Sequence, residues 1–137
     1  RGGSLAPPPW PAHARAEHHA IAYLEPLDAA NRAALGYDMA SEPTRRAAMD
    51  RARDTGQPAA SGLVFLKQEA VARTPQAGFL IYLPVYAPGP EPSTVGERRR
   101  RLRGHVYAAF RANELLAGIF GTEASPRVNF RVYDPPE

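Results

Sequence analysis

Apolar residues fill both sides of one stretch of the chain, from Gly78 to Tyr86. Successive side chains of a β-strand point to opposite faces, so Phe79 and Ile81 would lie on one face and Leu80 and Tyr82 on the other. The pattern predicts a central strand that protein covers on both faces. Pro84 has no N–H for the ladder, which predicts a bulge or an end of pairing there.

Shorter alternating patterns predict four further strands, at residues 18–24, 58–68, 105–111 and 127–133. Residues 69–77 are polar and predict a hairpin loop. The strand before this loop and the central strand would therefore form an antiparallel pair.

Apolar residues at helical spacing predict four helices, at about residues 26–35, 42–55, 94–103 and 113–120. Ser41 is the expected N-cap of the second helix and Gly56 its stop. Thr94 and Glu97 form a capping box for the third helix, and Gly104 would end it. Asn113 would cap the fourth. The second helix would pack a narrow alanine and methionine stripe inward and pair its charged residues at the surface.

This order of elements predicts an α+β fold, a PAS-like five-stranded antiparallel sheet with helices packed on one face. Residues 1–18 are rich in proline and predict an extended arm that Trp10 docks. Residues 19–134 would form the domain itself. A chain of 137 residues has the usual length of one domain.

Composition excludes several kinds of function. The chain has no cysteine, which rules out disulfides, a thiolate metal site and a cysteine nucleophile. The net charge of +3 is too small for the one-sign field of a dedicated nucleic-acid binder. No Ser-His-Asp arrangement with local context, glycine-rich phosphate loop or paired acids on one element is visible. A small hydrolase or transferase would rest on nothing more than scattered Asp, His and Ser residues.

A series of different short motifs follows along the chain. They are Tyr23-Leu24-Glu25-Pro26, Leu35-Gly36-Tyr37-Asp38, Ser41-Glu42-Pro43, Ala52-Arg53-Asp54-Thr55-Gly56, Gln68-Glu69, Gly78 to Tyr86 and Gly104-His105-Val106-Tyr107. Together they closely resemble the CHASE domain, the extracytoplasmic sensory module of bacterial membrane-bound signalling proteins and plant cytokinin receptors.

The resemblance implies a periplasmic ligand-sensing domain flanked by transmembrane helices in the full-length protein. It implies a diguanylate cyclase or histidine kinase of a two-component system as cytoplasmic output, a homodimer, and no enzymatic activity or cofactor in this chain. The chain resembles the C-terminal, membrane-proximal PAS-like half of the family. Where cytokinin receptors place an aspartate and a threonine at the adenine ring, this chain has Arg45 and Tyr82. We therefore expect that cytokinins do not bind.

A ligand pocket would lie between the sheet and the second helix, because such sites are concave and mainly apolar. Strand parity gives the candidate ligand-binding residues Arg45, Phe65, Leu80, Tyr82, Tyr107 and Arg111. The two arginines would favour a carboxylate or phosphate ligand, since guanidinium binds such anions through two parallel hydrogen bonds. The alternatives are that the apolar candidates are plain core and that both arginines are solvated. A third reading is a ligand-free dimerisation module whose interior the side chains fill, Tyr82 included.

Two clusters of basic residues have a plain and a functional reading. The run from Arg98 to Arg101, with Arg103, would be a solvated helix face or a contact with anionic lipid headgroups. No aromatic residue lies between these arginines to stack on bases. His18 and His19 are adjacent on a predicted strand and would point to opposite faces, which argues against a metal site.

Overall fold

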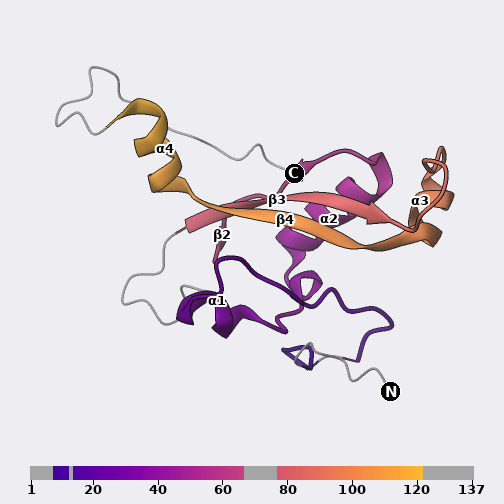
Figure 1. Cartoon of the computed structure of the whole chain (residues 1–137), viewed down its shortest axis with the longest axis horizontal. Helices are drawn as coiled ribbons and strands as arrows, with labels where there is room; N and C mark the ends of the chain where they lie inside the picture. The colour runs from indigo at the N-terminus through magenta and orange to yellow at the C-terminus, as the bar shows by residue number, and fades with distance from the viewer. Residues whose placement is uncertain (1–7, 13, 67–76, 122–137) are drawn as a thin grey trace.

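The computed structural model describes residues 8–12, 14–66 and 77–121, with two long strands at its centre (Figure 1). Strand β3 (Ala77–Tyr86) pairs antiparallel with β4 (Leu102–Arg111) along its whole length. The other edge of β3 pairs with two short strands, β1 (Ala59–Ala60) and β2 (Val64–Phe65). The prediction of a central strand is confirmed. Pro84 pairs with His105, and the register shifts between Val85 and Tyr86, just beyond the proline.

Strands β1 and β2 are two parts of the predicted strand at residues 58–68, and a bulge separates them. Ala60 pairs with Ile81 and Val64 with Gly78, so four steps along one strand oppose three along the other. Ser61 occupies the bulge. Its N–H donates to the Leu80 carbonyl at 2.7 Å, and its hydroxyl accepts from the Leu80 N–H at 2.9 Å. The serine side chain thus replaces the backbone acceptor that regular pairing would supply.

The prediction of a strand at residues 18–24 is wrong. This segment is extended, but its pairing is limited to an isolated antiparallel bridge between Ala20 and Asp38. Asp38 belongs to a segment whose other side receives the arm, through a parallel bridge between Trp10 and Tyr37. The Trp10 indole packs on Tyr37 with ring centroids 4.8 Å apart, which confirms that Trp10 docks the arm.

The described part of the chain therefore has a four-stranded antiparallel sheet, and the mixed α and β class is confirmed. Five strands are not confirmed. The predicted strand at residues 127–133 and most of the predicted hairpin loop lie outside the described residues.

All four predicted helices are present, and some of their caps differ from those expected. They are α1 (Ala29–Ala34), α2 (Pro43–Thr55), α3 (Val95–Arg101) and α4 (Ala112–Phe120), and a short 3₁₀ helix, η1 (Met39–Ser41), precedes α2. The capping box opens α3 as predicted, and Asp28 caps α1, a cap that the sequence analysis did not identify.

Ser41 does not cap α2, because it ends η1. Glu42 takes that place, and its carboxylate accepts from the N–H groups of Thr44 and Arg45. A negative charge at this end also complements the helix dipole. Gly56 ends the helix with φ +73°, a conformation that glycine adopts without strain.

Two further caps differ. Gly104 lies within β4, because α3 passes directly into that strand at Leu102. Asn113 lies inside α4, where Arg111 is the N-cap residue and no side chain caps the helix.

Helix α2 packs on one face of the sheet and forms the core with it. The buried apolar residues are Ile21, Ala34, Tyr37, Met39, Ala40, Ala48, Met49, Ala52, Ala59, Val64, Leu66, Leu80 and Tyr82. They include the predicted stripe of α2 and, from β3, Leu80 and Tyr82.

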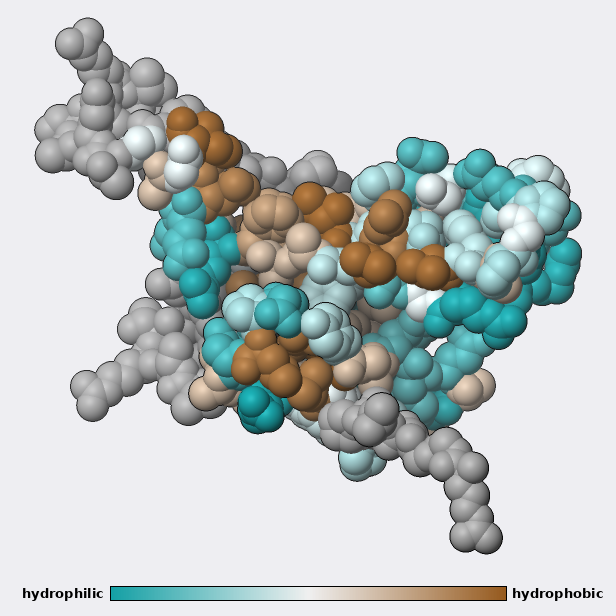
Figure 2. Space-filling model, in the orientation of Figure 1, coloured by the Kyte–Doolittle hydropathy of each residue, from teal (hydrophilic) through white to brown (hydrophobic). Residues whose placement is uncertain are grey.

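The opposite face of the sheet is not covered by the described residues. Leu83 is 45% exposed, Phe65 66% and Val106 61%. Figure 2 shows apolar residues gathered on the surface over β3, β4 and α4. The described residues therefore do not confirm the prediction that protein covers both faces of the central strand.

Candidate functional site

A cavity of about 580 Å³ lies between the extended segment 18–25 and strand β4. This volume is within the range of small-molecule sites. Its lining is His18, His19, Ala20, Ile21, Ala22, Tyr23, Leu24, Glu25, Met39, Met49, Tyr82, Arg103, Gly104, His105, Val106 and Tyr107. The expected site was between the sheet and α2. Because α2 packs directly against β3, the cavity lies beside that contact, and α2 contributes Met49 to it.

Apolar and aromatic side chains form the inner wall of the cavity. Met39, Met49 and Tyr82 are all at least 96% buried. The Tyr82 hydroxyl lies 3.8 Å from the Met39 sulfur, and the rings of Tyr82 and Tyr107 are 6.0 Å apart. Burial raises the pKa of Tyr82, and it raises the pKa of Tyr107 to about 12. Both phenols are therefore neutral hydrogen-bonding groups at physiological pH.

Two histidines meet at the cavity from different elements. The rings of His19 and His105 are 5.5 Å apart, and the His105 Nε2 lies 3.1 Å from the Met49 carbonyl oxygen. A carbonyl only accepts, so Nε2 carries the proton and Nδ1 is an acceptor. That Nδ1 is buried and has no hydrogen-bond partner in the described part of the chain. Burial, and then the neighbouring His19, lower the pKa of His105 to about 4; burial also lowers the pKa of His19. Both rings are neutral at pH 7.

A buried carboxylate holds the segment that carries His19. Asp38 is 0% exposed, forms an ion pair with Arg15, and lies 2.8 Å from the His18 Nδ1. Its carboxylate also accepts from the N–H groups of His19 at 3.0 Å and Ala40 at 3.1 Å. Burial by itself would raise the pKa of Asp38, but the hydrogen bonds outweigh it and lower that pKa to about 2. The ionised carboxylate thereby fixes the backbone on the outer side of the cavity.

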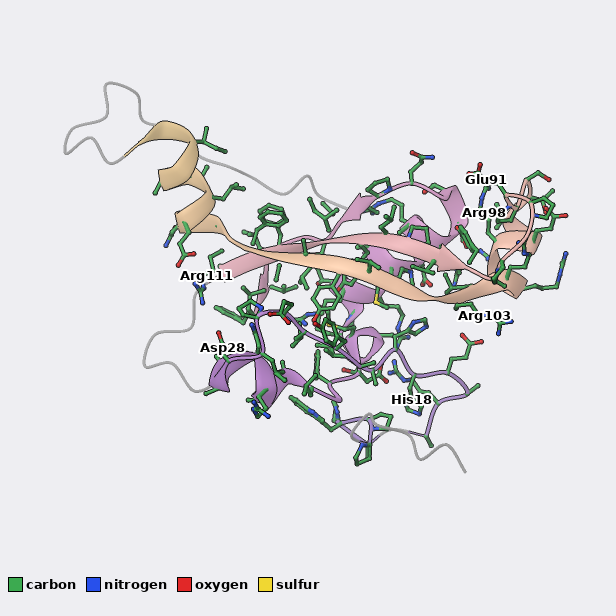
Figure 3. The ribbon with its side chains drawn as sticks, viewed as in Figure 1. His18, Asp28, Glu91, Arg98, Arg103 and Arg111 are labelled. Atoms are coloured by element: carbon green, nitrogen blue, oxygen red, sulfur yellow. The ribbon has the colours of Figure 1, made fainter. Side chains whose placement is uncertain are left out.

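The predicted site residues are not all brought together. Tyr82 and Tyr107 line the cavity, whereas Leu80 is part of the core, 2% exposed. The Phe65 side chain points to the uncovered face of the sheet. Arg111 lies at the far end of β4, where it pairs with Glu114 at 2.8 Å, opposite the end that carries Arg103 (Figure 3).

Arg45 is not a surface residue, contrary to the expectation from helix periodicity. It is 2% exposed. Its guanidinium donates to the Phe65 carbonyl at 2.7 Å and to the Met39 sulfur at 3.2 Å, and lies 5.2 Å from the Tyr37 ring centroid. These contacts tie α2 to β2 and η1. The guanidinium is thus engaged inside the core, and Arg45 and Arg111 do not share a site.

Sequence reasoning missed Met39, Met49, His19 and His105. Strand parity could have found His105, because it lies two residues from Tyr107 on β4 and therefore on the same face. Nothing in the sequence pattern places His19 there, because its segment is not part of the sheet.

The arginine run is partly used inside the protein. Arg98 donates to the Asp54 carbonyl at 3.1 Å, Arg99 makes two hydrogen bonds to the Asp54 carboxylate, and Arg101 donates to the carbonyls of Ala87 and Pro90. The face is partly solvated: Arg99, Arg100 and Arg103 are exposed, whereas Arg98 and Arg101 are half-buried. Lipid contact through the remaining arginines stays a prediction.

Among the described residues, no three or more His, Cys, Asp or Glu side chains are placed to hold a metal ion. None of the helices in this part of the chain is long and apolar enough to cross a membrane.

Comparison with known proteins gives one family. The sequence model of the CHASE domain matches residues 6–137, a range that includes both walls of the cavity and the arm that carries Trp10. A search of curated proteins found no match.

Proposed function

Because the chain belongs to the CHASE domain family, the extracellular sensory domains of membrane receptors, we propose that it binds a small molecule as the input of a signalling protein. The observation that carries this proposal is the cavity of about 580 Å³ between segment 18–25 and β4. Its walls are mainly apolar, its inner polar groups are the neutral Tyr82, Tyr107, His19 and His105, and its lining also includes the exposed Glu25 and Arg103. These groups are suited to reversible recognition.

Signalling would follow from a change in packing. A ligand can shift an equilibrium between two arrangements by no more than its difference in affinity for them. Segment 18–25 would contact a ligand directly, and Asp38 ties this segment to the residues that precede α2. A ligand that favours one position of the segment would therefore also favour one position of those residues. We propose that the full-length protein is a membrane-anchored homodimer with a periplasmic sensor, and that a diguanylate cyclase or a histidine kinase is its output.

The test is a thermal-shift screen of small metabolites, with each hit checked by calorimetry. Ala22 lines the cavity and is exposed, so Ala22→Trp should fill the cavity without disturbing the core. Ala33→Trp, on the exposed side of α1, is the matched control. We expect a hit to bind the wild-type chain and the control but to lose at least tenfold in affinity for the Ala22→Trp variant. A hit with equal affinity for both variants would place the site elsewhere.

A ligand-free dimerisation module is the second candidate, favoured by the direct packing of α2 on the Tyr82 face. It would be supported if no compound raised the melting temperature. An adenine-type cytokinin belongs in the screen as a negative probe, because Tyr82 fills the space that the ring would need. Micromolar binding of that compound would contradict this expectation.

A further inference from the structure

One wall of the cavity is the outer edge of strand β4. In the described residues, β4 pairs with β3 alone. In an antiparallel strand, alternate residues direct their N–H and C=O groups to one side and the rest to the other. Half of the backbone groups between Arg103 and Tyr107 therefore point away from β3, on the edge that lines the cavity. An unpaired edge of this kind can accept another strand.

The opposite wall is also a backbone edge. Ile21 donates to the Tyr37 carbonyl and Met39 donates to the His19 carbonyl, each at 3.0 Å, on either side of the bridge between Ala20 and Asp38. In such a pair the bridged residues direct their own N–H and C=O outward. The Asp38 N–H accordingly donates to Trp10, on the far side, at 2.8 Å. The Ala20 groups then point away from Asp38, and Ala20 lines the cavity.

The backbone of the second wall is unpaired toward the cavity. Neither Ala20 nor Ala22 has a backbone hydrogen bond to another described residue. Alternation along an extended chain places Ala22 on the same side as Ala20. Among the described residues, the cavity therefore separates two edges that have no backbone partner, one from the main sheet and one from the small layer built by Trp10, Tyr37 and Ala20 (Figure 1).

The size of the cavity fits a short strand. Neighbouring strands lie about 4.8 Å apart, stacked layers about 10 Å, and each residue rises about 3.3 Å, so one strand residue fills roughly 160 Å³. A cavity of about 580 Å³ then holds between three and four residues. Independently, the five residues from Arg103 to Tyr107 span about 13 Å, which is also the length of about four residues.

We propose that the ligand of the cavity is an extended peptide of three or four residues, bound between the edge of β4 and the edge at Ala20. This inference rests on the proposed sensory function and names its ligand class. Main-chain hydrogen bonds to two edges would supply affinity, as in other cases of strand addition. Alternate side chains would point toward Met39, Met49 and Tyr82, so an apolar residue is favoured at the central position.

The first test changes the ligand and leaves the protein intact. Acetyl-Ala-Leu-Ala-amide has blocked ends, an apolar centre and all its backbone donors, and its fully N-methylated analogue has lost those donors. Calorimetry with the 137-residue chain should show binding of the first peptide and at least about tenfold weaker binding of the second, because each lost hydrogen bond costs on the order of 1 kcal/mol. Equal affinities, or no binding of either peptide, would overturn the proposal.

The second test changes the protein edge. Ala20→Pro removes the N–H that points into the cavity and leaves the bonds of Ile21 and His19 to the neighbouring segment intact. Ala16→Pro, in the arm outside the cavity lining, is the matched control. We expect about tenfold weaker binding of the unmethylated peptide by Ala20→Pro and no change for Ala16→Pro. An Ala20→Pro variant that binds the peptide as tightly as the wild type would overturn the proposal. If that variant does not fold, the comparison of the two peptides is the deciding test.

Hydrogen exchange distinguishes a peptide site from direct pairing of the β4 edge with the edge at Ala20. The amide of Ala20 should exchange quickly in the peptide-free chain and slowly in the complex. Slow exchange without peptide would show that the edges pair with each other, and would overturn the proposal. A small molecule that binds in the cavity while no tripeptide does would leave the sensory function standing and refute the peptide class.

Discussion

His105 is a residue whose surroundings change its protonation. It lies on β4, donates to the Met49 carbonyl at 3.1 Å, and has its other ring nitrogen buried. Burial lowers its pKa from 6.5 to about 4. Between these two pH values the unfolded chain binds more protons than the folded one, so stability decreases as pH falls through this window. The Asp38 carboxylate affects stability in a lower pH range, because folding lowers its pKa from 3.8 to about 2.

We expect the free energy of unfolding to fall by roughly 1 kcal/mol between pH 6.5 and 4.5 on account of His105, because partial exposure of the ring to water reduces the effect of burial. His105→Gln should remove most of this dependence, because glutamine does not titrate. Urea unfolding followed by tyrosine and tryptophan fluorescence at four pH values from 7.5 to 4.5 measures the slope. Arg103→Gln, two residues away on the same strand, should keep the wild-type slope. If His105→Gln keeps it too, the histidine does not carry the effect.

Single residues also show where sequence reasoning reaches its limit. Periodicity assigned Arg45 to the solvent face of α2, yet its guanidinium is enclosed by Phe65, Met39 and Tyr37. A buried arginine is uncommon unless partners are available, and these partners come from three separate segments. Only tertiary structure brings them together.

At the scale of elements, the C-terminal end of α2 is joined to α3 and β3. Arg99 and Arg53 both bind the Asp54 carboxylate and lower its pKa. The Tyr86 hydroxyl donates to the Arg53 carbonyl at 2.5 Å, and Arg98 donates to the Asp54 carbonyl. These contacts join α2, α3 and β3 at one point, so the loss of one side chain should weaken the contacts between all three elements.

Arg99→Ala should lower the urea midpoint by a small but measurable amount, because it removes a bidentate ion pair that is largely exposed to water. Arg100→Ala is the matched control, since Arg100 lies on the same helix, is exposed, and has no hydrogen bond or ion pair to another described residue. It should cost at most a few tenths of a kcal/mol. The difference in urea midpoint between the two variants should shrink at high salt. Equal losses would show that the ion pair contributes nothing.

Elements with local signals could be predicted from sequence. The apolar run of β3, the alternation of β4, the capping box of α3 and the glycine stop of α2 each depend on neighbouring residues. The strand expected at residues 18–24 is absent because a strand needs a partner edge, and among the described residues this segment forms a single bridge, from Ala20 to Asp38. The bulge at Ser61 was equally hidden, because a side-chain hydroxyl there replaces a backbone acceptor.

At the scale of the whole molecule, the sheet of the described residues has one covered and one open face. The open face of β2, β3 and β4 carries no charged side chain; it presents Phe65, Phe79, Ile81, Leu83, Val85, Val106, Ala108 and Phe110. An apolar surface of this kind lowers the solubility of an isolated domain.

Val106→Lys should raise solubility and reduce concentration-dependent light scattering, because Val106 is 61% exposed and the lysine can reach water. Its effect on the free energy of unfolding should stay below about 1 kcal/mol. Leu80→Lys, on the covered face of the neighbouring strand, should prevent folding instead, because Leu80 is 2% exposed and a charge would be buried there. Similar stabilities for the two variants would contradict the assignment of the faces.

For the molecule as a whole, the sequence predicted the class of fold and the family more reliably than the site. Of the six candidate residues, Tyr82 and Tyr107 line the cavity. Strand parity placed them, but it could not show that α2 closes the space beneath β3 or that segment 18–25 stands apart from β4. Both facts depend on packing between distant parts of the chain.

The ion pair of Asp38 with Arg15 limits where an expressed fragment of this domain can begin. Its two side-chain partners, Arg15 and His18, belong to the arm, while Asp38 itself is 0% exposed. A shortened gene that begins at His19 would leave this carboxylate buried without a cation and would also delete Trp10 from Tyr37. Expression clones should therefore begin ahead of Trp10, although the described residues of the arm form neither a helix nor a strand.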